Sequence, residues 1–155
     1  MSTPPQNSFR ITSAPNISYA KWDAERFETT STSWTDVPGA SINLSLGQGA
    51  PSYGALFVAT FSAEALSSDQ GGDGQGVLYA TVFFGDQQAE PLSNNHRFIT
   101  ARGNPEWSSH TLIRVVRFEP EFAERKVNAQ VKLHVSDRDM GGVQNWVLKI
   151  ERYNL

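Results

Sequence analysis

Alternation of apolar and polar residues is the feature that most constrains how this chain folds. Five apolar residues in one segment alternate with polar ones: Val127, Ala129, Val131, Leu133 and Val135. A period of two places successive side chains on opposite faces, so the segment predicts a β-strand with one buried and one solvated face. Residues 41–46 and 146–151 repeat the pattern, and turn-forming residues separate the runs. The sequence therefore favours an all-β fold.

Eight runs of this kind predict eight strands. They cover residues 26–34, 41–46, 54–62, 76–84, 96–101, 109–118, 126–135 and 145–153. Short strands between turn signals are typical of an antiparallel β-sandwich, and we expect an eight-stranded jelly roll. With 155 residues and no cysteine, the chain is long enough to bury a core without disulfides. Residues 1–25, which hold three prolines, predict an extended N-terminal arm before a jelly-roll domain at 26–155.

Two of the runs, residues 55–61 and 77–84, are apolar on both faces of the strand. A sandwich strand with one solvated face does not need a second apolar face. The N-terminal arm, a loop of this chain or another subunit must cover it, and the sequence leaves these alternatives open. Another subunit would bury aromatic rings in a permanent interface. The expected interface residues are Phe57, Phe61, Tyr79 and Phe83.

The charge and hydropathy of the chain exclude several classes of partner. The net charge is −3, from 13 basic and 16 acidic residues, and gives no basic surface for nucleic acid. No stretch approaches the roughly 18 apolar residues of a membrane helix. The N-terminus lacks the basic start and apolar run of a secretory signal. We therefore expect no nucleic-acid or membrane partner, and a protein that is cytoplasmic or is released by lysis or on a particle.

Residue types that carry catalysis are scattered along the chain. His96, His110 and His134 are at least 14 positions apart, so the paired ligands of a metal-binding jelly roll are missing. There is no nucleophile elbow and no phosphate-binding glycine loop. The acidic loop at 68–76 holds two carboxylates, fewer than a calcium site gathers, and predicts a flexible hairpin loop. We expect no catalytic residue, no metal and no cofactor.

One group of residues carries binding chemistry: Asn94, Asn95, His96, Arg102, Trp107 and His110. An indole ring stacks on the apolar face of a sugar, while amide, guanidinium and imidazole groups bond its hydroxyls. These residues predict a ligand site in the end loops of the sandwich. The alternative is that Trp107 anchors its own loop by packing, as aromatic residues more often do.

Several segments resemble a small jelly-roll domain that is common in phage and phage-like structural proteins. The segments are 29–40, 54–61, 82–87, 109–116, 127–135 and 146–152. The resemblance implies a topology similar to the tumour-necrosis-factor type of jelly roll, which commonly packs as a trimer through aromatic-rich strands. Residues 119–125 depart from the pattern, because such domains usually place a short Gly-x-His-type turn there.

We therefore expect a non-catalytic, self-associating module, with a trimer favoured, that serves a structural or receptor-binding role. The first alternative is a carbohydrate-binding module that uses the end-loop residues. The second is a small jelly-roll enzyme or biosynthetic accessory protein, which would need the histidines to converge with carboxylates.

Overall fold

The computed structural model describes residues 11, 14–46, 54–69, 75–92, 97–102, 105–119 and 125–154. They form β1 (Ile17–Asp23), β2 (Phe27–Thr29), β3 (Thr35–Leu46), β4 (Ala55–Asp69), β5 (Gln75–Phe84), β6 (Gln87–Gln88), β7 (Arg97–Arg102), β8 (Ser108–Phe118), β9 (Arg125–Val135) and β10 (Asp139–Asn154). The predicted all-β fold is confirmed. The predicted count of eight strands is wrong, because the described residues hold ten.

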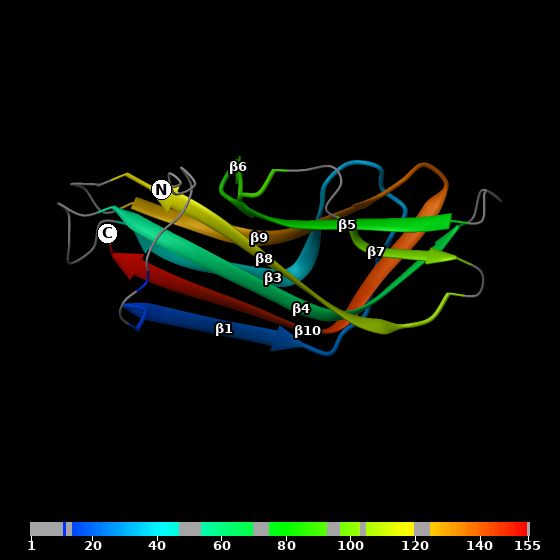
Figure 1. Ribbon diagram of the computed structural model, residues 1–155, viewed down its shortest axis with the longest axis horizontal. Helices are drawn as coiled ribbons and strands as arrows, with labels where there is room; N and C mark the ends of the chain where they lie inside the picture. Colours follow the sequence, from blue (N-terminus) through cyan, green and yellow to red (C-terminus); the bar gives the residue numbers. More distant parts are fainter. Residues whose placement is uncertain are drawn as a thin grey trace, which may run out of the picture.

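Two antiparallel sheets pack face to face as a sandwich (Figure 1). The β10 sheet has the order β1-β10-β4-β8, with β2 also paired to β10. The β5 sheet has the order β3-β9-β5-β6, with β7 also paired to β5. From β3 to β5 and again from β7 to β10, each strand lies in the opposite sheet to the one before it. Strands that are neighbours in a sheet are therefore mostly distant in sequence, which is the jelly-roll arrangement.

The two strands that the sequence did not predict are the two-residue β6 and β1, and β1 lies within the expected arm. β1 pairs with β10 from Ile17 opposite Arg152 to Asp23 opposite Trp146. The side chains of β1 are exposed almost throughout, so this strand lacks the alternation that identified the other strands. Backbone pairing with an edge of the β10 sheet forms this strand, and that pairing leaves no apolar signature in the sequence.

Inward-facing aromatic rings fill the space between the sheets. Phe57 on β4 has its ring centroid 5.8 Å from that of Phe84 on β5 and 5.8 Å from that of Phe118 on β8. Further along β4, Phe61 lies 5.9 Å from Phe98 and 6.3 Å from Trp146. Both Phe57 and Phe61 are fully buried. The core therefore joins β4 and β10 of one sheet to β5 and β7 of the other.

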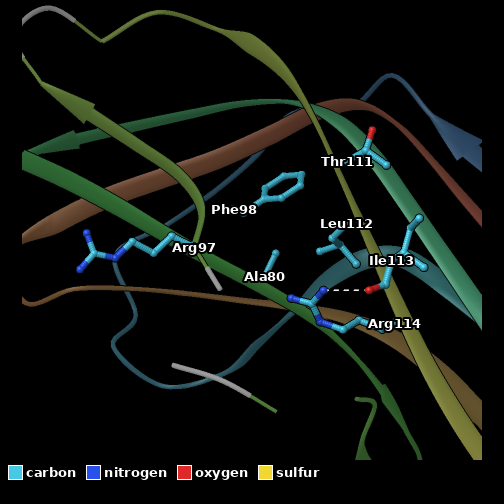
Figure 2. Close-up of a pocket in the computed structure, with 7 residues that line it drawn as sticks. All are labelled: Ala80, Arg97, Phe98, Thr111, Leu112, Ile113 and Arg114. Carbon is cyan, nitrogen blue, oxygen red and sulfur yellow. Dashed lines mark hydrogen bonds between the residues drawn. The ribbon is translucent and has the colours of Figure 1, made fainter. Parts of the chain in front are cut away.

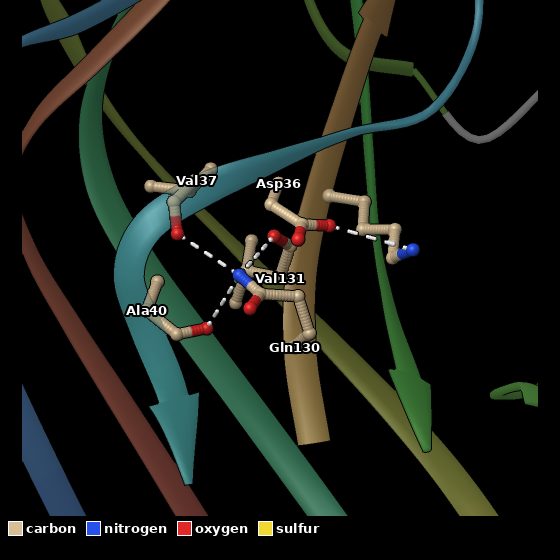
Figure 3. A network of polar contacts seen from close by, with 6 residues as sticks. Asp36, Val37, Ala40, Gln130 and Val131 are labelled. Atoms are coloured by element: carbon tan, nitrogen blue, oxygen red, sulfur yellow. Dashed lines mark hydrogen bonds and ion pairs between the residues drawn. The ribbon is translucent and has the colours of Figure 1, made fainter. Parts of the chain in front are cut away.

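Residues 36–39, which lie between two predicted strands, form instead a bulge inside β3. The register with β9 shifts between Asp36 and Ser41, and Gly39 takes a positive φ of 79°. The side-chain amide of Gln130 on β9 donates to the carbonyls of Val37 at 2.9 Å and Ala40 at 3.2 Å (Figure 3). A strand side chain thus replaces the ladder bonds that the bulge interrupts, so β3 continues past it.

The connection between the last two predicted strands, 126–135 and 145–153, is shorter than expected, because β10 begins at Asp139. The turn closes with Asp139 N–H donating to the Ser136 carbonyl at 2.9 Å, and Arg138 has a positive φ of 66°. Gly141 then lies inside the strand, since a Cβ there would come within 2.7 Å of Leu78 Cδ1 on the facing sheet. This glycine permits close packing of the sheets and does not mark a turn.

Gln130→Met should destabilise the protein by about 1–3 kcal/mol, because the carbonyls of Val37 and Ala40 lose their side-chain donor. Urea unfolding followed by tryptophan fluorescence measures the change. Asn128→Met is the matched control, since Asn128 is an exposed amide two residues earlier on the same strand. Equal unfolding midpoints for the two variants would contradict the role of Gln130.

Candidate functional site

The predicted end-loop site is only partly within the described structure. Asn94, Asn95 and His96 lie outside the described residues. Arg102 is exposed at the end of β7. His110 on β8 packs 5.7 Å from the Phe98 ring and shares a 2.7 Å hydrogen bond with the Ser108 hydroxyl. The shared ligand site of these residues stays a prediction.

Trp107 is half-buried, and a cation covers its ring. The Arg26 guanidinium carbon lies 4.9 Å from the indole centroid, which is a cation–π contact. Arg26 Nε also donates to Gln144 Oε1 at 3.1 Å, and Gln144 Nε2 donates to Glu64 Oε2 at 2.8 Å. Hydrogen bonds from Gln144 and Asn145 lower the pKa of the Glu64 carboxyl. A series of polar contacts thus runs over the outer surface from Trp107 through Arg26 and Gln144 to Glu64, and we call it the polar chain.

The residues predicted for a subunit interface divide between two places. Phe57 and Phe61 have no exposed surface in the single chain, so they pack the core and are not available to a partner. Tyr79 and Phe83 lie on the opposite side of β5, on the outer face of the β5 sheet, where they are half-buried. Successive residues of a strand face opposite ways, so these two odd-numbered residues of β5 point away from Phe84, whose ring contacts Phe57 in the core.

A loop of this chain covers part of that outer face. Trp34, just before β3, places its ring edge-on 6.0 Å from Phe83 and 4.3 Å from His134. The His134 ring stacks on Tyr79 at 4.4 Å and 16°. The Ser31 carbonyl accepts a 2.9 Å hydrogen bond from Val135 N–H, which holds this segment against β9. The sequence left three possible covers for the second apolar face of β5, and the structure shows that a loop of this chain covers part of it.

The outer face of the β10 sheet is more open. Trp22 on β1 is directly opposite Val147 on β10, and these side chains are 72% and 44% exposed. Ile113 on β8, 56% exposed, lies on the same face because Thr60 of β4 pairs with both Ile113 and Lys149. The half-buried Val58 and Val115 pair in the next row. We call Trp22, Val58, Ile113, Val115 and Val147 the outer patch.

Polar groups of β10 lie in the same rows as residues of the outer patch, because Lys149 pairs with Thr60 and Glu151 pairs with Val58. Lys149 Nζ lies 3.9 Å from Glu151 Oε1, and Tyr153 donates to Glu151 Oε2 at 2.9 Å. The hydrogen bond and charge of Glu151 raise the pKa of the Tyr153 hydroxyl. Protein contact surfaces combine apolar and polar side chains in this way. Sequence reasoning missed this patch for two reasons. The patterns of β8 and β10 are those of ordinary half-exposed strands, and β1 was not predicted.

The described residues show no geometry for metal chemistry. They contain no group of three His, Cys, Asp or Glu side chains placed to hold a metal ion. Residues 70–74 of the acidic loop lie outside the described part, which includes its flank Asp69 at the end of β4. No helix long and apolar enough to cross a membrane occurs in the described ranges.

Comparisons with known proteins find similarity in overall shape alone. No protein-family model and no curated protein matches the sequence. The structure of infectious bursal disease virus, Gx strain, aligns with a TM-score of 0.37 and 10% identity, covering 100% of this chain and 40% of that one. The T13 viral particle of the same virus gives 0.39 and 10%, with 100% and 39% covered. This chain thus spans less than half of those chains, and the likeness is too distant to indicate a function.

Burial in the ring cluster lowers the pKa of His134, which outweighs the opposite effect of the Val135 carbonyl. Protonation is therefore harder in the folded state than in the unfolded state, whose histidine pKa is about 6.5. The contribution of neutral His134 to the free energy of unfolding should be fully present above that pH. It should be lost as the pH falls from there towards the pKa of the folded state. Urea unfolding between pH 7.5 and 5 should show a smaller decrease in the free energy of unfolding for His134→Phe than for wild type. Parallel profiles would contradict this prediction.

Proposed function

We propose that the chain is a non-catalytic structural module that self-associates through the outer patch of the β10 sheet. The observation that carries the proposal is the convergence of Trp22, Ile113 and Val147 on one sheet face, each at least 44% exposed. The occupant we propose is a second copy of the same chain, since two related copies can bury the patch against itself or against a neighbouring element.

The residues around the outer patch support a protein contact. Large apolar side chains gathered on one face are uncommon on monomers and mark interaction surfaces. The register places Ser62, Thr60 and Thr111 between them, and Lys149 is the charged residue in the rows that join Trp22, Val147 and Ile113. The exposed half of Lys149 can reach the border of the patch, because a lysine stem lies along apolar surface while its ammonium stays in water.

A trimer is the assembly that we favour within this proposal. The resemblance of the sequence to jelly rolls of the tumour-necrosis-factor type supports it, as those domains commonly pack in threes. A receptor-binding role for the free surfaces of such an assembly follows as part of the same proposal.

Light scattering coupled to size exclusion tests the assembly. Wild type at micromolar concentration should elute with about three times the 17.1 kDa chain mass. The double variant Ile113→Lys, Val147→Lys should elute as a monomer, since two charges in the patch cannot be buried unpaired. Leu92→Lys is the control, because Leu92 is 61% exposed and outside the patch. A monomeric wild type, or equal dissociation of the control, would overturn the proposal.

Glycan binding is a second candidate, and the polar chain at Trp107 favours it. An indole, a guanidinium, an amide and a carboxylate lie in contact on one surface, from Trp107 through Arg26 and Gln144 to Glu64. These groups are the ones that proteins use to hold a sugar ring.

A glycan array tests this second candidate. Trp107→Ala should lose any binding that wild type shows, while Trp22→Ala, on the outer patch, should keep it. An array without hits, or equal binding by Trp107→Ala, would count against a glycan ligand.

A further inference from the structure

A cavity of about 380 Å³ opens at the edge of the sandwich between β8 and β5 (Figure 2). Its lining residues come from three strands: Ala80 of β5, Arg97 and Phe98 of β7, and Thr111, Leu112, Ile113 and Arg114 of β8. Ala80, Phe98 and Leu112 are buried side chains of the core. The cavity is therefore an opening into the apolar interior, and Ile113 is the lining residue that also belongs to the outer patch.

Strand pairing explains why the sandwich is open at this point. β8 is the last strand of the β10 sheet, and its far edge is bonded at Val115, which exchanges two 2.8 Å hydrogen bonds with Glu90. On the facing sheet, β7 pairs with β5 from Gln75 to Tyr79, and β6 pairs only with Phe83 and Phe84. Within the described ranges, no strand is paired with this side of Ala80. Among the described strands, the mouth lies between β7 and β6.

Arg114 points into this opening from a position that the alternation of β8 assigns to the core. Its neighbours in the same phase, Leu112 and Val116, are buried, and Arg114 itself is only 8% exposed. Figure 2 shows its guanidinium extending from β8 towards Ala80 on the opposite sheet. A charge on the inward face of a sandwich strand is unusual, since burial of an ion destabilises the fold unless an opposite charge compensates it.

No such compensation is present in the described part of the chain. The guanidinium makes one hydrogen bond, from Nη1 to the Ile113 carbonyl at 2.9 Å, and Nε has no partner there. No described carboxylate lies within 4.0 Å as an ion pair to Arg114. Loss of solvent lowers the pKa of Arg114, with no opposing effect from an acid. The cavity thus has a positive charge on one wall that no acid among the described residues compensates.

We propose that this cavity binds a small organic carboxylate with an apolar body. The carboxylate would accept hydrogen bonds from the Arg114 guanidinium, which is suited to planar anions. The apolar body would lie against Phe98, Leu112 and Ala80. A volume of about 380 Å³ is within the range of small-molecule sites and exceeds the ~150 Å³ that holds a benzene ring. Arg97 lines the rim, and its exposed guanidinium points away from Arg114 (Figure 2).

The backbone of β8 can assist in holding the anion. The N–H and C=O groups of alternate residues in an edge strand face away from its partner strand. Val115 directs its groups outward to Glu90, so Ile113 and Thr111 direct theirs to the same free edge. The Ile113 carbonyl accepts a hydrogen bond from Arg114, so the guanidinium lies at this edge. The Ile113 N–H faces the same edge and is a neutral donor close to the guanidinium.

Benzoate is a suitable probe, with benzyl alcohol as its neutral counterpart and inorganic phosphate as an anion without an apolar body. Thermal unfolding of wild type should shift upward by a few degrees at about ten times the Kd of benzoate. Neither of the other two compounds should produce this shift. Two-dimensional NMR should place the benzoate-induced changes at the signals of Ala80, Phe98 and Leu112.

Arg114→Met tests the role of the charge. It should bind benzoate at least about tenfold more weakly than wild type, while unliganded Arg114→Met unfolds at the same temperature as wild type or a higher one. Arg117→Met, an exposed arginine three positions further along β8, should behave like wild type. The proposal fails if benzoate leaves wild type unchanged or stabilises Arg114→Met equally. It also fails if phosphate or benzyl alcohol raises the unfolding temperature as much as benzoate does. If Arg114→Met does not fold, the NMR experiment on wild type still tests the proposal.

Discussion

The packing of β4 against the facing β5 is the contact on which the rest of the structure depends. Phe57 and Phe61 project from the middle of the β10 sheet, with β10 on one side of their strand and β8 on the other. Their rings contact Phe84 and Phe98 of the other sheet. Because a strand exposes alternate residues to opposite faces, fixing these two rings in the core also fixes the outward direction of Val58 and Thr60. The composition of the outer surface thus follows from the core.

The two outer faces of the sandwich differ in how they are covered. On the β5 sheet, the segment ending at Trp34 contacts Phe83 and His134, and Lys132 lies over Phe83 at 4.8 Å. The chain itself therefore shields much of the second apolar face of β5. On the β10 sheet, β1 extends the sheet sideways and brings Trp22 beside Val147 without covering either. This asymmetry places the proposed contact between copies on the β10 sheet.

Arg114 departs from the rule that otherwise organises the core. Its position in β8 belongs to the inward series, yet it carries a charge where an apolar side chain would stabilise the fold. Departures of this kind concentrate at functional sites, where stability is exchanged for binding. The open edge beside Ala80 gives the charge a cavity to face, and the two features together support a ligand site.

The sequence by itself determined the all-β class, most strands and the apolar series of β9 and β10, because a period of two is a local property of the chain. It also indicated that β4 and β5 are apolar on both sides. Only the tertiary structure decided that Phe57 is core and Tyr79 is surface, because strand parity has no meaning until the sheets face each other. The arm's strand, the bulge held by Gln130, the outer patch and the Arg114 cavity all depend on residues distant in sequence. Their pairing leaves no local pattern, so no reading of the sequence alone could have placed them.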